Sequence, residues 1–307
     1  MPTVQANLRL IFDNVLLPTD FTRASTQAFA YARAFAKSFG ARILVTHAVT
    51  PHPPVFLPMQ PVPLAFDAEW QEAQEHMHRT LASPLLDDTR HAGILERGEL
   101  WNVLQDVAQR HSIDLIILAS HGKHGLKKLV LGSAAEQIFR QVRCPVLTVG
   151  PEVPLPIVET ATFKRIVFAT DFSAGSLAAL PFALSLAEDS QAHLTLLHVR
   201  PMVPVQHQLW TEDHAKQNLA ALIPPDATDW CQPATLVSFE FPAEGILHTA
   251  DAEGADLIVM GVHKGAPRAS SHLPWAIAYE VVATPSARCS PCAASRKWRR
   301  QHAQSEA

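Results

Sequence analysis

Glycines and basic side chains are concentrated in one short segment, residues 119–137, which reads ASHGKHGLKKLVLGSAAEQ. Its glycines permit positive backbone dihedrals and allow backbone N–H groups to approach a ligand closely. Lysine and histidine side chains add positive charge beside them. This combination predicts an anion-binding loop. The residues concerned are Gly122, Gly125, Gly132, Lys123, Lys127, Lys128, His121 and His124.

The end of this loop reads as the start of a helix. Ser133 and Glu136 have the spacing of a capping box, and an apolar-periodic segment follows them. A helix amino end offers free N–H groups and partial positive charge, so phosphate is its natural ligand. The alternative is a mobile surface loop followed by an ordinary capped helix. No GxxxxGK motif is present, which excludes a Walker A site.

The elements around the loop predict a doubly wound α/β domain. Continuous apolar runs at residues 15–18, 43–49, 114–119 and 144–149 suit strands buried on both faces. Segments with helical periodicity alternate with them: one runs from Ala28 to Phe39 and ends at Gly40, with Thr22 as a candidate cap, and two more cover residues 68–81 and 100–111.

A second polar segment, PTDF at residues 18–21, follows the first predicted strand. In such sheets, ligands bind outside the carboxyl ends of the strands, where the strand order reverses. If the first and fourth strands are neighbours, Asp20 and the glycine loop face one crevice.

The chain contains this domain twice. VLLPTDFTRAS from Val15 is matched by IVFATDFSAGS from Ile166, and IDLIILASHG from Ile113 is matched by ADLIVMGVHK from Ala255. A repeat of this length indicates two copies of a whole domain. We therefore expect a first domain over residues 1–150, a proline-containing linker over 151–162 and a second domain over 163–307.

Composition narrows the class of protein. The 307 residues carry a formal net charge of -4, which argues against a nucleic-acid binder, and no apolar run is long enough to span a membrane. The amino end lacks a signal peptide pattern, so we expect a cytoplasmic protein.

Four cysteines imply no disulfide framework. Cys289 and Cys292 form a CxxC, but in a Ser/Pro/Ala-rich tail rather than at a helix start.

The pairing of PTDFT with SHGKHGLKKLVLGSAAEQIFRQVRCPVLTV resembles the universal stress protein family, in a tandem arrangement. Nucleotide-binding members of the family carry G-x2-G-x9-G-S/T, and here Ala119 replaces the first glycine. The resemblance implies a Rossmann-like fold with a mainly parallel five-stranded sheet in each domain. It also implies ATP, with a divalent cation such as Mg2+, as ligand, and pairing of the two domains or of two chains. The implied binding residues are Pro18, Thr19, Asp20, Ala48, Ala119, His121, Gly122, Gly132 and Ser133.

The second copy departs from the pattern. By the resemblance, Asp20 and Ala48 lie beside the adenine or ribose, and Asp171 and Val199 stand at the corresponding positions of the second copy. Gly261 supplies the first glycine of the pattern. Lys264, Pro274 and Trp275 stand where the pattern has Gly, Gly and Ser, which predicts that this copy does not hold a triphosphate. Another anion at His263, Lys264 and Arg268 is a further alternative. The tail after residue 283 shows no apolar run comparable to the last strand of the first copy.

Other chemistry finds little support. Glu72, His76 and His78 are candidates for a metal site, but a solvated helix face explains them better, and His47 and His198 read as hydrogen-bonded strand ends. No catalytic motif is present, so at most slow ATP hydrolysis is expected. The sequence thus favours an ATP-binding regulatory protein of the stress response. Two alternatives stay open, an interaction module without nucleotide and a nucleotide-using enzyme.

Overall fold

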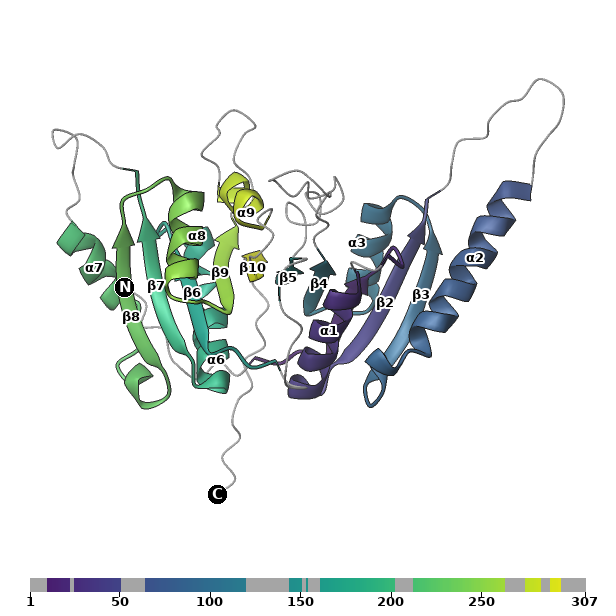
Figure 1. Ribbon diagram of the computed structural model, residues 1–307, viewed down its shortest axis with the longest axis horizontal. Coiled ribbons are helices and arrows are strands. Elements are labelled where there is room, and N and C mark those ends of the chain that lie inside the picture. Colours follow the sequence, from purple (N-terminus) through teal and green to yellow (C-terminus); the bar gives the residue numbers. More distant parts are fainter. Residues whose placement is uncertain are drawn as a thin grey trace, which may run out of the picture. The chain divides into compact units, whose positions relative to one another are not determined.

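A computed structural model of the 307-residue chain shows an α/β protein (Figure 1). It describes residues 10–22, 25–50, 64–119, 144–150, 153, 161–201, 212–262, 274–282 and 288–293. Within these ranges, no helix combines the length and the hydropathy needed to cross a membrane.

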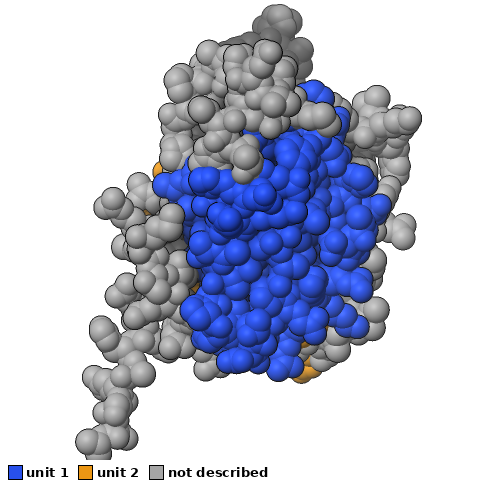
Figure 2. Space-filling model, turned by 90° about the vertical axis from the view of Figure 1, so that its left-hand side faces the viewer, with its two compact units in different colours: residues 1–10, 163–278, 291–307 blue, residues 11–162, 279–290 orange. Residues whose placement is uncertain are grey.

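The chain forms two compact units. Unit 1 contains residues 163–278, which belong to the second copy of the repeat, and its described residues make one unbroken surface in Figure 2. Unit 2 contains residues 11–162, which belong to the first copy, together with residues 279–290. A short piece near the carboxyl end therefore packs with the first copy.

Unit 2 is built on a parallel sheet with the order β3-β2-β1-β4-β5. Strand β1 is paired with β2 on one side and with β4 on the other. The chain thus winds outward from β1 through β2 to β3 and returns to the other side of β1, which is the doubly wound arrangement expected from the sequence. The elements are β1 (Asn14–Pro18), α1 (Ser25–Phe39), β2 (Arg42–Val49), α2 (Leu64–Leu81), a 3-10 turn (Pro84–Leu86), β3 (Arg90–Arg97), α3 (Leu100–Arg110), β4 (Leu115–Ala119) and β5 (Val146–Val149).

The apolar runs form the core of this unit. The middle of β1 is fully buried, and Phe35 from the predicted stripe of α1 packs edge-on against Phe12, with ring centroids 5.9 Å apart. Helix α1 ends as predicted at Gly40, whose φ of 65° favours glycine. Helices α2 and α3 confirm the two further predicted helices.

Unit 1 repeats the plan with four parallel strands in the order β9-β6-β7-β8. Its elements are β6 (Arg165–Ala169), α5 (Ala174–Leu177), α6 (Leu180–Ser190), β7 (His193–Val199), α7 (Glu212–Ala220), a 3-10 turn (Ala227–Asp229), β8 (Gln232–Ser238), α8 (Pro242–Ala252), β9 (Leu257–Val262) and α9 (Pro274–Val282).

The tail forms one more strand, which the sequence did not lead us to expect. Strand β10 (Arg288–Ala293) pairs antiparallel with β5, with Arg288 opposite Val149 and Cys289 opposite Thr148. The second copy therefore lacks a fifth parallel strand in the described part of the chain. Strand β10 also covers the edge of β5, and an exposed strand edge is a known site of unwanted pairing.

An aspartate before the fourth strand fixes the start of the central strand in each copy. The Asp114 carboxylate accepts hydrogen bonds from the backbone N–H groups of Asp13 at 2.9 Å and Asn14 at 3.0 Å. In the second copy, Asp256 accepts from the N–H groups of Lys164 at 2.6 Å and Arg165 at 3.0 Å. Each carboxylate ties the amino ends of two neighbouring parallel strands together.

Removing one of these carboxylates is expected to destabilise its unit. Asp114→Ala leaves two backbone N–H groups without their acceptor, which costs about 1–3 kcal/mol. Urea denaturation followed by circular dichroism measures this, with Asp106→Ala, an exposed residue of α3, as the matched control. Equal midpoints for the two variants would contradict the role given to Asp114.

Candidate functional site

The carboxyl ends of three strands meet at one edge of the unit 2 sheet. Because β1 runs parallel to both β2 and β4, Pro18, Val49 and Ala119 lie at the same edge. The predicted adjacency of the first and fourth strands is confirmed. The chain leaves β1 and β4 in opposite directions here, which makes this edge the switch point at which such sheets bind ligands.

The turn after β1 is held by hydrogen bonds within it. The buried hydroxyl of Thr19 accepts from the N–H of Phe21 at 3.0 Å. The exposed carboxylate of Asp20 accepts from the N–H of Thr22 at 3.0 Å and from its hydroxyl at 2.7 Å. Thr22, the candidate helix cap, therefore donates two hydrogen bonds within this turn. Phe21 has a φ of 60°, a left-handed conformation that costs a side chain energy unless its surroundings hold it.

A histidine at the end of β2 supports the same turn. His47 Nδ1 lies 2.7 Å from the carbonyl oxygen of Thr19. A carbonyl oxygen only accepts, so Nδ1 carries the proton and donates, which leaves Nε2 as an acceptor. The ring of Phe21 packs 4.5 Å from that of His47 and 5.3 Å from that of His76 on α2. His47 thus has the strand-end structural role that the sequence favoured.

The second copy builds the same turn. His198 Nδ1 lies 2.8 Å from the carbonyl oxygen of Thr170, and the Thr170 hydroxyl accepts from the N–H of Phe172 at 3.0 Å. Phe172 has a φ of 61°, and its ring lies 4.7 Å from that of His198. This geometry is therefore a property of the fold, and it does not by itself distinguish a binding copy from a non-binding one.

In the second copy, the segment after the turn is hydrogen bonded back to it. In the second copy, the Ser173 side chain accepts from the N–H of Ser176, and the Ser176 hydroxyl lies 2.8 Å from the hydroxyl of Thr170. Burial tends to raise the pKa of Asp171, but hydrogen bonds from Ser173 and Ser176 outweigh it and bring the pKa below its ordinary value. The polar groups of this turn thus have partners inside the protein.

Gly261, at the end of β9, is needed for packing. A Cβ at this position would lie 2.2 Å from the carbonyl oxygen of Gly175 and 2.5 Å from the Cα of Ser176. The backbone of α5 therefore rests directly on the strand end. The first copy has Ala119 at the corresponding position, and its methyl group would not permit the same contact. The family's first glycine is retained in the copy whose own backbone fills the space above it.

The structure brings together part of the predicted site. Pro18, Thr19, Asp20, Ala48 and Ala119 all lie at the switch-point edge, with Ala48 one residue before the end of β2. The predicted phosphate-side residues His121, Gly122, Gly132 and Ser133 lie outside the described residues, as do His263, Lys264 and Arg268. Pro274 begins helix α9, at the position that corresponds to Gly132.

The sequence did not predict that helix α2 lies beside this turn. A hollow of about 260 Å³ lies between the turn and α2, and His76, Arg79 and Thr80 of that helix face Thr19 and Phe21 across it. His76 Nε2 also lies 3.8 Å from Glu72 Oε1, which makes the two a helix-surface ion pair when the imidazole is protonated. Their i,i+4 spacing is the signal from which the sequence favoured a solvated helix face over a metal site.

The described part of the chain forms no site for a metal ion and no site for thiol chemistry. No three His, Cys, Asp or Glu side chains lie there close enough to share an ion. Cys144 and Cys231 are buried, and neither is in a disulfide. Burial, with a smaller contribution from Glu188, raises the pKa of the Cys231 thiol to about 11.

Two doubly wound units, each with a Thr-Asp-Phe turn at its switch point, define a tandem protein of the parallel α/β class. The model of the universal stress protein family matches residues 12–150 and 162–272. The chain belongs to this family, as its sequence indicated. Proteins of this family are in general not classical enzymes.

Individual relatives agree with this assignment. A universal stress protein of Methanocaldococcus jannaschii is 30% identical over 141 residues, which cover 45% of this chain and 82% of that protein. A universal stress protein of Thermus aquaticus is 30% identical over 139 residues, covering 45% and 99%. The crystal structure of a universal stress protein from Archaeoglobus fulgidus matches 92% of this chain and 98% of its own, with a TM-score of 0.72 at 17% identity. That likeness shows the tandem fold.

Adding a methyl group at Gly261 is expected to destabilise unit 1. Gly261→Ala forces the backbone at Gly175 away from β9, and overpacking of this kind costs about 1–3 kcal/mol. The free energy of unfolding in urea measures it. The reciprocal change Ala119→Gly introduces no clash and should cost less than about 1 kcal/mol. A larger loss for Ala119→Gly than for Gly261→Ala would contradict the packing role.

The Cys231 thiol should resist alkylation in the native protein. Because its pKa is raised from 9.0 to about 11, the thiol stays protonated at pH 9, where an unfolded chain already releases protons. Native stability should therefore fall as the pH rises from about 9 to 11. Mass spectrometry of iodoacetamide-treated protein should show Cys231 modified only after unfolding, and rapid native labelling would refute this.

Proposed function

We propose that the first copy binds one ATP with Mg2+ at the switch-point edge of its sheet and that this ligand regulates the protein. The observation that carries the proposal is the pairing of β1 with β4, which brings the Asp20 turn and the start of the glycine loop to the same edge. A polar turn on one side and an N–H-rich loop on the other suit a ligand with a sugar at one end and phosphates at the other.

The residues on the described side fit a nucleoside. Ala48 is a small, half-buried side chain near the end of β2, and the exposed Asp20 lies in the turn that follows the neighbouring strand β1. Carboxylate oxygens only accept hydrogen bonds, so the Asp20 side chain has the chemistry to accept from a ribose hydroxyl. Mg2+ would neutralise charge on the phosphates, which Gly122, Gly132 and Ser133 would hold.

The second copy is proposed to hold no nucleotide. In this copy the backbone of α5 covers the end of β9 at Gly261, where a ligand would approach the strand end. Proline at position 274 removes an N–H group from the point where a phosphate would bind. One site per chain follows.

The proposed mechanism is linkage between ligand and conformation. ATP stabilises the state in which the loop of residues 121–133 is ordered around it, and that state presents a surface to a protein partner in the cytoplasm. Hydrolysis, if it occurs, is slow, with His121 and His124 the nearest groups in sequence for activating water. The alternative is an interaction module that works without nucleotide, which Ala119 in place of glycine favours.

Calorimetric titration with ATP and magnesium tests the proposal. Wild-type protein should bind one ATP per chain, and Asp20→Ala should weaken binding at least about tenfold through loss of a charged hydrogen-bond acceptor. The corresponding change in the second copy, Asp171→Ala, is the matched control and should leave affinity unchanged. Ser133→Trp, which copies Trp275, should abolish binding.

The outcomes separate the two candidates. No heat at millimolar ATP, from folded protein free of bound nucleotide, favours the interaction module. Equal losses for Asp20→Ala and Asp171→Ala overturn the assignment to one copy.

A further inference from the structure

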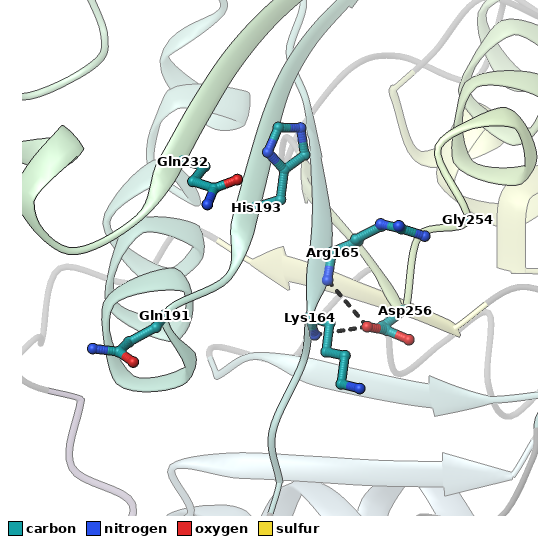
Figure 3. A pocket seen from close by; sticks show the side chains of 7 residues that line it. All are labelled: Lys164, Arg165, Gln191, His193, Gln232, Gly254 and Asp256. Atoms are coloured by element: carbon teal, nitrogen blue, oxygen red, sulfur yellow. Dashed lines mark hydrogen bonds between the residues drawn. The ribbon is translucent and has the colours of Figure 1, made fainter.

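A second hollow lies in unit 1, at the edge of the sheet opposite the Asp171 turn. It has a volume of about 490 Å³ and is lined by polar and charged residues at the amino ends of the strands (Figure 3). Sites of this fold are expected at the carboxyl ends of strands, so this hollow has no part in the proposed nucleotide site. Its lining includes Lys164, Arg165, Gln191, His193, Gln232 and Asp256.

Three of these residues form a row across the sheet. Arg165 on β6 is in register with His193 on β7, which is in register with Gln232 on β8. Residues in register on parallel strands project to the same face of the sheet. In Figure 3, His193 stands beside Gln232, and the Arg165 side chain extends towards Gly254. The row therefore places an arginine, a histidine and a glutamine on three neighbouring strands at the same end of the sheet.

The carboxylates nearby do not neutralise this row. Asp256 accepts from the backbone N–H groups of Lys164 and Arg165, not from their cationic ends. Glu253 Oε2 lies 4.0 Å from His193 Nε2. Within the described part of the chain, the Lys164 ammonium and the Arg165 guanidinium make no ion pair. Two permanently charged side chains, Lys164 and Arg165, thus line the hollow, and their N–H groups can donate to a ligand.

Helix capping does not account for these cations. Helices α6 and α8 both end at this edge, and backbone N–H groups already bond to carbonyls of their last turns. Ala192 N–H donates to Ala187 at 2.9 Å, and Ala255 N–H donates to Ala250 at 2.7 Å. Gly254 has a φ of 59°, which favours glycine after a helix, and the Arg165 guanidinium lies close enough that a Cβ at this position would be 2.9 Å from Nη1.

The first copy shows that the fold does not require this arrangement. Asp13 and Asn14 stand where the second copy has Lys164 and Arg165, and each pair donates its backbone N–H groups to the following aspartate in the same way. Arg90 occupies the position of Gln232 and donates to the carbonyl of Gly40 across this edge. The basic pair is therefore specific to the second copy.

We propose that this hollow binds a phosphate group, either as the free ion or as a small phosphate ester. Guanidinium groups pair with phosphate oxygens through two parallel hydrogen bonds, and a lysine ammonium adds a point charge. Arg165 and Lys164 provide these contacts, and His193, Gln191 and Gln232 donate from their side chains. This site is independent of the nucleotide site of the first copy.

Titration with inorganic phosphate, followed by amide NMR at constant ionic strength, tests the proposal. Saturable shifts are expected at residues 164–165, 191–193 and 254, with a dissociation constant on the order of 1 mM. The double variant Lys164→Asp with Arg165→Asn copies the first domain's residues and should weaken binding at least tenfold. Arg42→Gln, at the position that corresponds to His193, is the matched control and should change nothing.

Three results would overturn the proposal: shifts that grow linearly without saturation, equal binding by the double variant, or an equal loss in the Arg42→Gln control. A parallel titration with glycerol 3-phosphate distinguishes the two forms of the ligand. Tighter binding than inorganic phosphate identifies an ester as the ligand, and equal or weaker binding identifies the free ion. No nucleotide is present in either titration, so the result is separate from that of the calorimetry.

Discussion

The central strand β1 is hydrogen bonded to parallel neighbours on both sides, and the site proposed for the first copy depends on this constraint. Parallel pairing aligns strand ends, so the residues that follow β1, β2 and β4 reach one edge. The carboxylate of Asp114 accepts a backbone hydrogen bond at the amino end of β1, and His47 donates to the turn at its carboxyl end. A polar turn can then be kept in a strained conformation because its neighbours define its position.

The two copies keep this frame and differ in the residue at the end of the strand that follows the aspartate common to both, Ala119 in the first and Gly261 in the second. In the second copy, the backbone of α5 rests on Gly261, and serine hydroxyls satisfy the turn. In the first copy, Ala119 carries a methyl group at the same place. The second copy therefore keeps the motif glycine, Gly261, where its own backbone occupies the space. The first copy, for which we propose nucleotide binding, has alanine at that position. The packing around a motif residue is a better guide than its identity.

Much of the fold follows from the sequence because it rests on local pattern. The buried runs, the stripe of α1 and its end at Gly40 all have period or residue-type signals, and the repeat identifies equivalent positions. The sequence could not give the role of Gly261, which depends on a backbone contact with Gly175. Nor did it predict β10, because a short polar segment becomes a strand through the free edge of β5 and not through its own hydropathy. The row of Arg165, His193 and Gln232 likewise needs the register of three strands.

The central claim is that one copy binds nucleotide and the other does not. Hydrogen exchange with peptide resolution, with and without ATP and magnesium, compares the two copies within one molecule. The account predicts slower exchange on ligand addition at residues 15–22, 47–49 and 119–133, and unchanged exchange at residues 166–173 and 198–200. Equal protection of both turns, or protection of the second alone, would contradict it.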